Sequence, residues 1–444
     1  MTDKKKALGS IEKSFAISKA DMGKIIRDFH KEMDLGLAGK ESSLKMIPTY
    51  VDKPTGKEKG KFIALDLGGT NFRILELELM GNGEIGKPKI MKFALDRRTI
   101  TGTGEGFFDF LADCLKVFMQ KNGISTGEER RLGFTFSFPI KQTGVASGNL
   151  AYWTKGFEAK GVVGRDVVKL LDNSLARKGV TNIKISALAN DTVGTLVARS
   201  YEDRTCDVGV ILGTGTNACY PEKLANIAKW NGPDTRSGEM IINTEWGNFN
   251  KLHITSYDRM LDNSSDNPGQ QILEKMVSGM YLGEAARLVI ADLVKKRILF
   301  KGTGPGRFAE PKGIRAEDVS LAEGDRTRTL SKIGAFLETA GISVSGQTDR
   351  AMVKKVAGIV SRRAARISAA AIAAVVTKID QKLTERHTIA IDGSVYEKHP
   401  GFSGLMKRAL REIFGLKSSR IRMVLAKDGS GKGAAIIAAV ASTK

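Results

Sequence analysis

The chain has few of the residues that build cross-linked or metal-bound proteins. Its 444 residues include only three cysteines and four histidines. Three is an odd number for disulfide pairing, and neither Cys114, Cys206 and Cys219 nor the histidines have the spacing of a metal-binding motif. The composition therefore favours reduced thiols in a cytosol-like compartment and gives no support to a histidine metal site.

Long apolar runs are also missing. No segment approaches the roughly 18 consecutive apolar residues that a membrane-spanning helix needs. The first ten residues contain Lys4, Lys5 and Lys6 with no apolar stretch behind them, which is unlike a secretory signal. We therefore expect a cytoplasmic protein without a membrane partner.

Acidic residues are outnumbered: 49 Asp and Glu stand against 70 Lys and Arg, a formal net charge of +21. Such an excess is one sign of nucleic-acid binding. The basic residues are scattered in short groups, however, with no basic tail and no aromatic side chains between them. We interpret the charge as a solvated basic surface and expect no specific nucleic-acid partner.

The chain is longer than one typical hydrophobic core requires, so we expect two domains. Apolar runs alternate with helical patterns, which predicts an α/β fold. The stretch 301–325 is rich in glycine, proline and charge, which predicts a mobile loop, and residues 428–431 predict a turn before a last helix. The expected strands lie within 61–80, 132–138, 183–188, 208–220, 388–391 and 423–426, and the longer helices within 107–120, 163–177, 269–290 and 351–378.

Two glycine-rich turns, each entered from a short apolar run, are the most informative local pattern. They lie in residues 62–73 and 208–218, and each has an acidic residue close by, Asp66 and Asp207. Glycine lets backbone N–H groups converge on an anion, and the neighbouring threonines add hydroxyl donors. The pair predicts a duplicated clamp that binds the phosphates of a nucleotide from two sides.

Polar side chains also gather in loops that follow apolar strands. They come from residues 137–157, from Asn190 and Asp191, and from Glu245 and Glu274. Carboxylates and amides that each bind a pair of neighbouring hydroxyl groups suit a polyhydroxylated ligand. Taken singly, each has a structural alternative: Asp66 as a buried acid bonded to backbone, Asp191 as the cap of the following helix, and Glu245 and Glu274 as surface acids.

With these motifs in this order, the chain resembles the hexokinase family, the eukaryotic-type sugar kinases with an actin-like ATPase core. Residues 137–157 resemble the sugar signature of the family, and residues 62–73 and 207–220 its two phosphate motifs. Residues 389–400 resemble its adenosine motif, and residues 427–434 its last nucleotide-side turn. The similarity runs from about residue 20 to the end of the chain.

The resemblance implies an α/β, two-lobed actin-like ATPase (ribonuclease H-like) fold, with a small and a large lobe around a sugar-binding cleft. Residues 1–60 and 192–427 would form the large lobe, and residues 61–191 and 428–444 the small lobe. It implies an ATP- and Mg²⁺-dependent hexose 6-phosphotransferase that catalyses the first step of glycolysis, as a monomer or homodimer. Glucose is the default substrate, with fructose and mannose as alternatives. Lobe closure would exclude water, with hinges near residues 58–61, 188–194 and 426–430.

The resemblance also assigns roles to residues. Asp191 would be the general base, Lys155 would place a positive charge near the transferred group, and Asp66 would hold Mg²⁺ through water. The sugar-binding set would be Ser137, Thr154, Lys155, Asn190, Asp191, Asn217, Glu245 and Glu274. The nucleotide-binding set would be Asp66, Gly68, Gly69, Thr70, Asn71, Arg73, Thr214, Gly215, Gly393, Ser394 and Ser430.

The sequence departs from the family pattern at residues 313–319, which lack a threonine that contacts the nucleotide in relatives, and between Trp246 and Tyr257, where a surface loop is short. Three other functions therefore remain open: a non-catalytic sugar sensor, a nucleic-acid-binding protein on an ATPase scaffold, and a kinase for another polyol or an amino sugar. Intact Asp191, Lys155 and Glu245 argue against the sensor.

Overall fold

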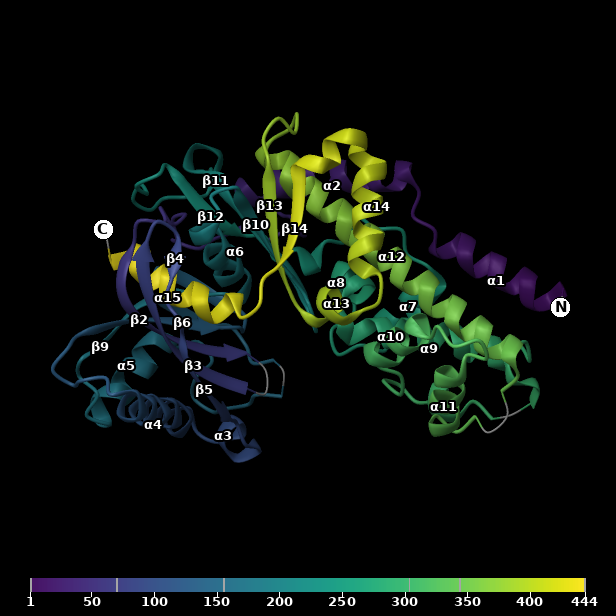
Figure 1. Cartoon of the computed structure of the whole chain (residues 1–444), viewed down its shortest axis with the longest axis horizontal. Coiled ribbons are helices and arrows are strands. Elements are labelled where there is room, and N and C mark those ends of the chain that lie inside the picture. Colours follow the sequence, from purple (N-terminus) through teal and green to yellow (C-terminus); the bar gives the residue numbers. More distant parts are fainter. Residues whose placement is uncertain (1, 69–70, 155, 303, 343–344, 443–444) are drawn as a thin grey trace.

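The computed structural model describes residues 2–68, 71–154, 156–302, 304–342 and 345–442. Its strands form two large mixed sheets and one small hairpin (Figure 1). The strands are β1 (Ile47–Pro48), β2 (Lys59–Gly68), β3 (Asn71–Gly81), β4 (Glu84–Ile85), β5 (Lys89–Ala94), β6 (Arg130–Phe136), β7 (Ile140–Gly144), β8 (Ser147–Leu150), β9 (Ile183–Ala189), β10 (Cys206–Leu212), β11 (Thr216–Lys223), β12 (Glu239–Asn243), β13 (His387–Asp392) and β14 (Ile421–Leu425).

Helices surround both sheets. The α-helices are α1 (Thr2–Phe15), α2 (Lys19–Leu37), α3 (Arg97–Thr101), α4 (Gly104–Asn122), α5 (Val167–Arg177), α6 (Asp191–Glu202), α7 (Ser256–Asn263), α8 (Ile272–Val277), α9 (Gly279–Lys295), α10 (Ala316–Gly324), α11 (Ser331–Thr339), α12 (Gln347–Ile379), α13 (Ser394–Lys398), α14 (Phe402–Phe414) and α15 (Gly429–Ser442). The 3₁₀ helices are η1 (Leu224–Asn226), η2 (Trp246–Asn248), η3 (Phe300–Gly302), η4 (Gly306–Ala309) and η5 (Gly415–Arg420).

The small lobe is the sheet β4-β3-β2-β6-β9, with β5 paired to β3, together with the helices packed on it. Strand β2 is buried on both faces, and its side chains alternate between them as strand geometry requires. Ile63, Leu65 and Leu67 pack in the core formed with α4 and α5. Phe62 and Ala64 belong to the core on the opposite face, which includes α6 and α15.

The large lobe is the sheet β1-β12-β11-β10-β13-β14 with the helices around it. Its central helix, α12, has a continuous buried stretch of alanine and other apolar residues at 369–376. Alanine favours the helix and its small side chain lets neighbours approach closely. Helices α2, α9, α10 and α14 pack against α12, and together they form the largest hydrophobic core of the molecule.

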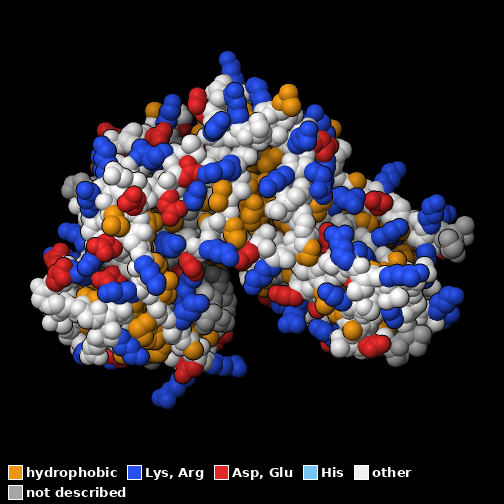
Figure 2. Space-filling view, viewed as in Figure 1, with side chains coloured by type: hydrophobic (Ala, Val, Ile, Leu, Met, Phe, Trp, Pro, Cys, Tyr) orange, Lys and Arg blue, Asp and Glu red, His pale blue; other side chains and the backbone are white. Residues whose placement is uncertain are grey.

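Helices α6 and α15 lie between the two sheets, and their apolar side chains form one core with strands of both lobes. The helices cross very closely. A Cβ atom on Gly433 would overlap with the backbone oxygen of Gly194, and one on Gly194 would lie 2.7 Å from the backbone oxygen of Ser430. Only glycine fits at this crossing. Figure 2 shows the surface deeply hollowed between the two lobes.

Three expectations from the sequence need correction. The helix expected at 269–290 is two helices, because the Gly279 N–H leaves the helix to donate to the Gly213 backbone oxygen at 2.7 Å. The expected mobile loop at 301–325 contains helix α10, whose start is held by the Asp318 carboxylate on the Arg315 N–H at 2.9 Å. The expected turn at 428–431 is the first turn of α15.

Two further findings concern cysteines and membranes. Cys114, Cys206 and Cys219 are free and buried, in keeping with the expected reduced thiols. Among the described helices we find none with the length and apolar character that crossing a bilayer requires.

The glycine crossing yields a stability prediction. Gly433→Val should lower the free energy of unfolding by about 3 kcal/mol or more, because the added carbons have no space against Gly194. Gly358→Ala is the matched control, since a Cβ atom at this position of α12 would meet nothing within 4 Å. The control should gain roughly 0.5–1 kcal/mol. Urea unfolding of both variants checks this, and equal stability of Gly433→Val and wild type would contradict the packing argument.

Candidate active site between the lobes

A charged cluster lies where the first turn of α15 meets β2 and β3. Asp66, which is buried at the end of β2, accepts hydrogen bonds at Oδ2 from Arg73 Nε at 3.0 Å and from Ser430 Oγ at 2.9 Å. Arg73 also forms an ion pair with Asp428. Burial alone would lower the Arg73 pKa, but Asp66 and Asp428 outweigh it and raise the pKa. Arg73 therefore neutralises two carboxylates from different parts of the chain.

Asp392 is a second acidic position, at the end of β13. Burial raises its pKa to about 6, and the negative charges of Asp191 and Asp428 add to this shift, while the Gly393 N–H and Arg73 oppose it. The electrostatic coupling means that Asp191, Asp392, Asp428 and Arg73 share one region. Strongly shifted carboxyl groups of this kind are concentrated at functional sites.

Asp191 and Asn190 form the beginning of α6, directly after β9. The Asn190 side chain caps the helix by accepting from the Thr192 N–H at 2.8 Å, and Asp191 Oδ1 accepts from the same N–H at 2.8 Å. The positive end of the helix dipole favours the ionised form of a carboxyl group at this place. The residue that caps α6 is therefore Asn190, and not Asp191 as the structural alternative from the sequence had it. The Asp191 carboxylate lies in the first turn of the helix, within the acidic region.

A third group of polar side chains lies on the large lobe. Asn217 Nδ2 donates to Glu245 Oε1 at 3.1 Å, and Asn243 Nδ2 donates to the same oxygen at 2.8 Å. Glu274 Oε2 accepts from the Thr216 N–H at 2.9 Å. Glu245 itself has a left-handed backbone conformation, with φ of 52°. These contacts join Asn217, Glu245 and the 215–216 turn beside Glu274 into one polar surface.

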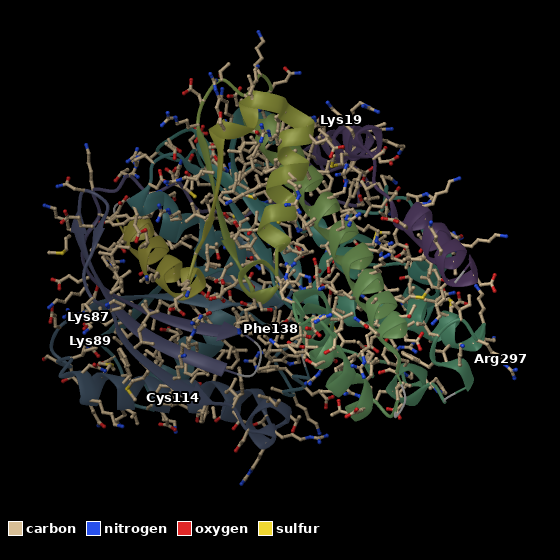
Figure 3. The ribbon with its side chains drawn as sticks, turned by 45° about the vertical axis from the view of Figure 1, so that its right-hand side comes forward. Lys19, Lys87, Lys89, Cys114, Phe138 and Arg297 are labelled. Atoms are coloured by element: carbon tan, nitrogen blue, oxygen red, sulfur yellow. The ribbon has the colours of Figure 1, made fainter. Side chains whose placement is uncertain are left out.

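The small-lobe residues of the sugar signature pack on aromatic side chains. Trp153 Nε1 donates to the Ala159 backbone oxygen at 2.9 Å, and its ring lies 4.9 Å from that of Phe138. Phe138 is labelled in Figure 3. Ser137 is adjacent to the first glycine turn, because a Cβ atom on Gly68 would lie 3.5 Å from Ser137 Oγ. The aromatic packing fixes the position of the loop that carries Thr154.

Ser394, predicted at the nucleoside, and Thr214, predicted at the phosphates, line a hollow of about 270 Å³ in the large lobe. Thr214 and Ser394 lie on one side of it, and residues 314–317 at the start of α10 lie on the other. Gly393 has φ of 122°, and a Cβ atom there would lie 2.6 Å from the Gly213 backbone nitrogen. The two glycines therefore let the strand ends that carry Thr214 and Ser394 come together.

The sequence-predicted residues thus fall into four groups in the structure: Asp66 with Arg73 and Ser430, Asn190 with Asp191, Asn217 with Glu245, Glu274 and the Gly215 turn, and Thr214 with Gly393 and Ser394. Ser430 was expected at the nucleoside but contacts Asp66. Ser137, Gly68 and Thr154 lie on the small lobe. Asn217 and Glu245, which were expected to bind the same sugar, lie on the large lobe. Gly69, Thr70, Lys155 and the Asn71 side chain lie outside the described residues.

Sequence reasoning missed three members of the site. Asp392 and Asp428 share the charged region, and Asn243 supports Glu245. Asp392 ends a buried strand just before a glycine, which is the pattern that identified Asp66 near the first turn. The same signal could therefore have found Asp392. Asp428 carries no such signal, because its partner Arg73 is 355 positions away in the chain.

Within the described ranges, no group of three or more histidine, cysteine or acidic side chains is arranged to hold a metal ion directly. Mg²⁺ in phosphate-transfer sites keeps several waters and needs only one or two carboxylates besides the substrate phosphates. Asp66, buried and facing the Arg73 and Ser430 side chains, fits a contact through water rather than a protein cage.

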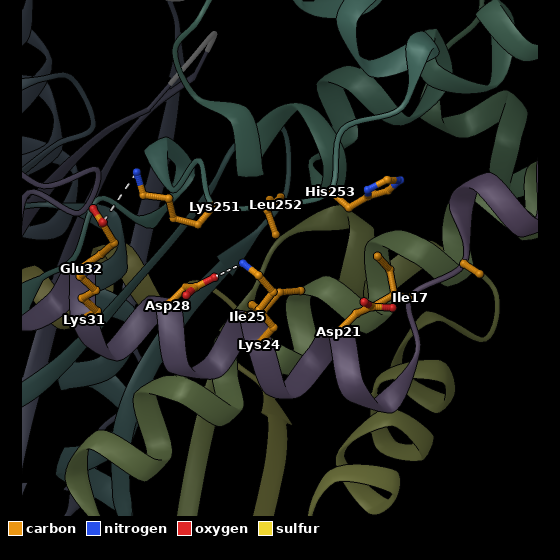
Figure 4. A pocket seen from close by; sticks show the side chains of 11 residues that line it. Ile17, Asp21, Lys24, Ile25, Asp28, Lys31, Glu32, Lys251, Leu252 and His253 are labelled. Carbon is orange, nitrogen blue, oxygen red and sulfur yellow. Dashed lines mark hydrogen bonds and ion pairs between the residues drawn. The ribbon is translucent and has the colours of Figure 1, made fainter.

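A larger hollow of about 630 Å³ lies elsewhere, between α2 and residues 251–253 (Figure 4). Its charged side chains pair with one another: Lys24 with Asp28 at 2.5 Å and Lys251 with Glu32 at 3.8 Å. Size alone would favour this hollow, but it contains none of the predicted site residues. We therefore assign the active site to the region between the lobes.

Comparisons with known proteins agree with the resemblance and with the fold expected from it. Two family models described as hexokinase match residues 7–201 and 207–440. The chain is 43% identical to Hexokinase-2 of Oryza sativa subsp. japonica over 93% of its length and 86% of that protein, and 42% identical to Hexokinase-1 of Nicotiana tabacum over 92% and 85%. The solved hexokinase of Schistosoma mansoni complexed with glucose is 36% identical, with a TM-score of 0.86 over 98% of this chain and 99% of that one.

The raised pKa of Asp392 predicts how stability depends on pH. Because the pKa is about 6 in the folded protein against 3.8 ordinarily, the folded state is penalised as pH rises through 6. Asp392→Asn removes this penalty, so it should stabilise the protein at pH 8 by at most about 3 kcal/mol and have little effect at pH 4. Thermal unfolding of variant and wild type across this pH range tests the prediction.

Asp380→Asn is the control, because the pKa of Asp380 is shifted in the opposite direction from that of Asp392. Burial would raise the Asp380 pKa, but the N–H groups of Glu385 and Thr384 lower it below the usual value. Asp380→Asn should therefore destabilise the protein at pH 8. A gain for Asp392→Asn that is the same at pH 4 and pH 8 would show that its charge is not the cause.

Proposed function

Since the chain is a member of the hexokinase family, we propose that it transfers the γ-phosphate of ATP to the 6-hydroxyl group of a hexose. Glucose is the main substrate in this proposal, with fructose and mannose as alternatives. The observation that carries it is the electrostatic coupling of Asp392 to Asp191, Asp428 and Arg73 at the junction of the lobes. Strand register adds the large-lobe group to this region, because Ile211 of β10 pairs with Asp392 on one side and with Asn217, a partner of Glu245, on the other.

Asp191 acts as the general base in this proposal. A hydroxyl group is a poor nucleophile until its proton is taken up, and a positioned base contributes typically 10²–10⁴-fold in rate. The position of Asp191 at the start of α6 supports the role, because the positive end of the helix dipole favours a negative charge there. Asp191 also lies close enough to Asp392 for its negative charge to add to the raised pKa of Asp392.

The hexose is held from both lobes. Asn217, Glu245 and Glu274 offer amide and carboxylate groups on the large lobe, where Asn243 orients Glu245. Asn190 lies beside the base, and Ser137 and Thr154 approach from the small lobe. Lys155 follows Thr154 in the chain and brings a positive charge toward the transferred group. A carboxylate or amide group can bind two neighbouring hydroxyl groups at once, and a sugar has such pairs of hydroxyl groups. The residues therefore support a sugar as the acceptor of the phosphate.

The nucleotide lies across the junction of the lobes. Gly68, Gly69, Thr70, Asn71 and Arg73 face its phosphates from the small lobe, and Thr214 and Gly215 from the large lobe. Gly393 and Ser394 lie at the nucleoside. Asp66 holds Mg²⁺ through water, and the ion, when bound with ATP, neutralises charge on the phosphates. Arg73 is already oriented by Asp66 and Asp428, so it needs little rearrangement to bind a phosphate oxygen.

Closure of the lobes protects ATP from water, which would otherwise accept the phosphate. The chain passes between the sheets at three places: before β2, between β9 and β10, and between β14 and α15. We expect the hinges of the closure near these crossings, at residues 58–61, 188–194 and 426–430. We further infer a cytoplasmic enzyme, supported by its three free cysteines, that works as a monomer or homodimer.

The general-base assignment is tested by Asp191→Asn. The variant should bind glucose nearly as wild type does but turn over at least about 100-fold more slowly, because the amide cannot take up the proton. Asp166→Asn is the matched control, since Asp166 caps α5 in the small lobe by accepting from the Val168 N–H at 2.8 Å. The measurement is ADP release from Mg-ATP with glucose, fructose, mannose, glucosamine and no sugar.

The outcomes separate the functions. ADP release only with a hexose, lost in Asp191→Asn and kept in Asp166→Asn, supports the kinase. Sugar binding without ADP release in the wild type would point to a sugar sensor, and normal turnover of Asp191→Asn would remove Asp191 as the base.

Closure predicts a change of shape on sugar binding. Saturating glucose should reduce the radius of gyration in small-angle X-ray scattering, because the hollow between the lobes narrows (Figure 2). L-glucose at the same concentration controls for contrast. An unchanged radius with glucose, under conditions where calorimetry detects its binding, would contradict lobe closure.

A further inference from the structure

A buried histidine lies beside the hollow that we assign to the nucleoside. His399 follows α13 and is 5% exposed. Its Nδ1 is 2.6 Å from Ser320 Oγ, and its Nε2 is 2.8 Å from both Ser361 Oγ and Glu323 Oε2. Ser320 and Glu323 belong to α10, and Ser361 belongs to α12. One imidazole ring thus connects three segments that are far apart in the sequence.

The hydrogen-bond directions follow from the partners. Ser361 donates its own hydrogen to the Ala357 backbone oxygen at 2.9 Å, and an ionised Glu323 can only accept. His399 Nε2 therefore carries the hydrogen and donates to both oxygens. In the neutral ring, Nδ1 accepts from Ser320. Both ring nitrogens take part in hydrogen bonds. Replacing the ring by an apolar side chain would therefore leave Ser320, Ser361 and Glu323 without their hydrogen bonds to His399.

The segments joined by His399 are the two sides of the nucleoside hollow. Residues 314–317, on one side, run directly into α10, which carries Ser320 and Glu323. Ser394, on the other side, begins α13, which leads to His399. The ends of these segments also touch, since a Cβ atom on Gly324 would lie 3.0 Å from Pro400 Cγ. A shift of His399 would therefore move one side against the other.

Helix α10 is short and is held by tertiary contacts. It packs against α9 and α12, and of its nine residues Val319 and Ala322 are buried. A short helix of this kind is marginal without tertiary contacts. The bonds of Ser320 and Glu323 to His399 supply such contacts on the face that turns toward α12 and α13.

We propose that His399 is a positioning residue for the nucleotide: by bonding Ser320, Glu323 and Ser361 it fixes the α10 side of the nucleoside hollow against the α13 side. The proposal rests on the assignment of this hollow to the nucleotide under the proposed function. The His399 ring does not contact the nucleotide itself; it affects nucleotide binding by holding α10 in place.

The test compares His399→Phe with a matched histidine. His30 also connects helices, since its Nε2 is 2.8 Å from the Ala374 backbone oxygen of α12, but it lies on α2 and does not line the nucleoside hollow. His399→Phe should raise the KM for ATP roughly 10- to 100-fold, the factor that corresponds to the loss of one hydrogen bond to a charged group. The KM for glucose and kcat should stay near the wild-type values. His30→Phe should lower the melting temperature but leave the KM for ATP unchanged.

Two further variants keep the test decisive if His399→Phe does not fold. Ser320→Ala removes one bond from a partly exposed position and should raise the KM for ATP by a smaller factor. His399→Gln retains a donor and should restore part of the affinity. Calorimetric binding of ADP gives a second readout that needs no turnover, and ADP should bind more weakly to both His399 variants than to His30→Phe.

The results that would overturn the proposal differ from those that would overturn the function. Equal KM values for ATP in Ser320→Ala, His399→Gln and His30→Phe would remove the positioning role. The positioning role would also be removed if His399→Phe changed the KM for glucose, the KM for ATP and kcat to a similar extent, because that pattern indicates general damage to the fold. Absence of ATP-dependent turnover in the wild type, with ADP still bound, would refute the proposed function and leave the positioning role to be decided by the ADP affinities.

Discussion

The crossing of α6 and α15 at Gly194 and Gly433 determines how the two lobes meet. Helix α6 packs on strands of the large-lobe sheet, and α15 packs on strands of the small-lobe sheet. At the crossing, the backbone of Gly194 contacts the backbone of Gly433, and a side chain at either position would keep the helices apart. The same crossing positions residues of the candidate site, because α6 begins with Asp191 and α15 carries Ser430 in its first turn. The contact between the helices thus also places Asp191, the proposed base, in the region that contains Arg73.

This placement has an electrostatic cost. Asp191, Asp392 and Asp428 influence one another, and among the charged groups named for this region Arg73 is the cation that opposes them. Buried like charges destabilise a fold, so an arrangement that serves stability alone would replace one of them. Strongly shifted carboxyl groups are concentrated at functional sites, and a proton or a cation that enters this region would reduce the repulsion. The raised pKa of Asp392, caused first by burial, therefore fits the candidate site better than a purely structural role.

The sequence predicted the parts of the fold that depend on local pattern. Strands β2, β9 and β10 are apolar runs with clear ends, so the acidic residue within the first, Asp66, and the one after the second, Asp191, could be singled out from the pattern. Asn217 came from the family resemblance. Where tertiary contacts decide, local pattern failed. Gly279 breaks a helical pattern only because Gly213 accepts its N–H, and the glycines of α15 suggested a turn because their partner, Gly194, is distant in the chain. The family resemblance supplied the roles but did not single out Asp392, whose raised pKa comes first from burial and then from the charges of Asp191 and Asp428, which are distant in the chain.

Residues 392–400 bring two parts of the candidate site together in one short segment. At its start, Asp392 interacts electrostatically with Asp191, the proposed base; a Cβ atom on Gly393 would lie 2.6 Å from the Gly213 backbone nitrogen, and Ser394 lines the hollow proposed for the nucleoside. At its end, His399 bonds Ser320 and Glu323 of α10. The carboxyl group that acts on Asp191 and the side chain that lines the hollow are thus only two positions apart in the chain, so the end of β13 places the acidic region and the nucleoside hollow side by side.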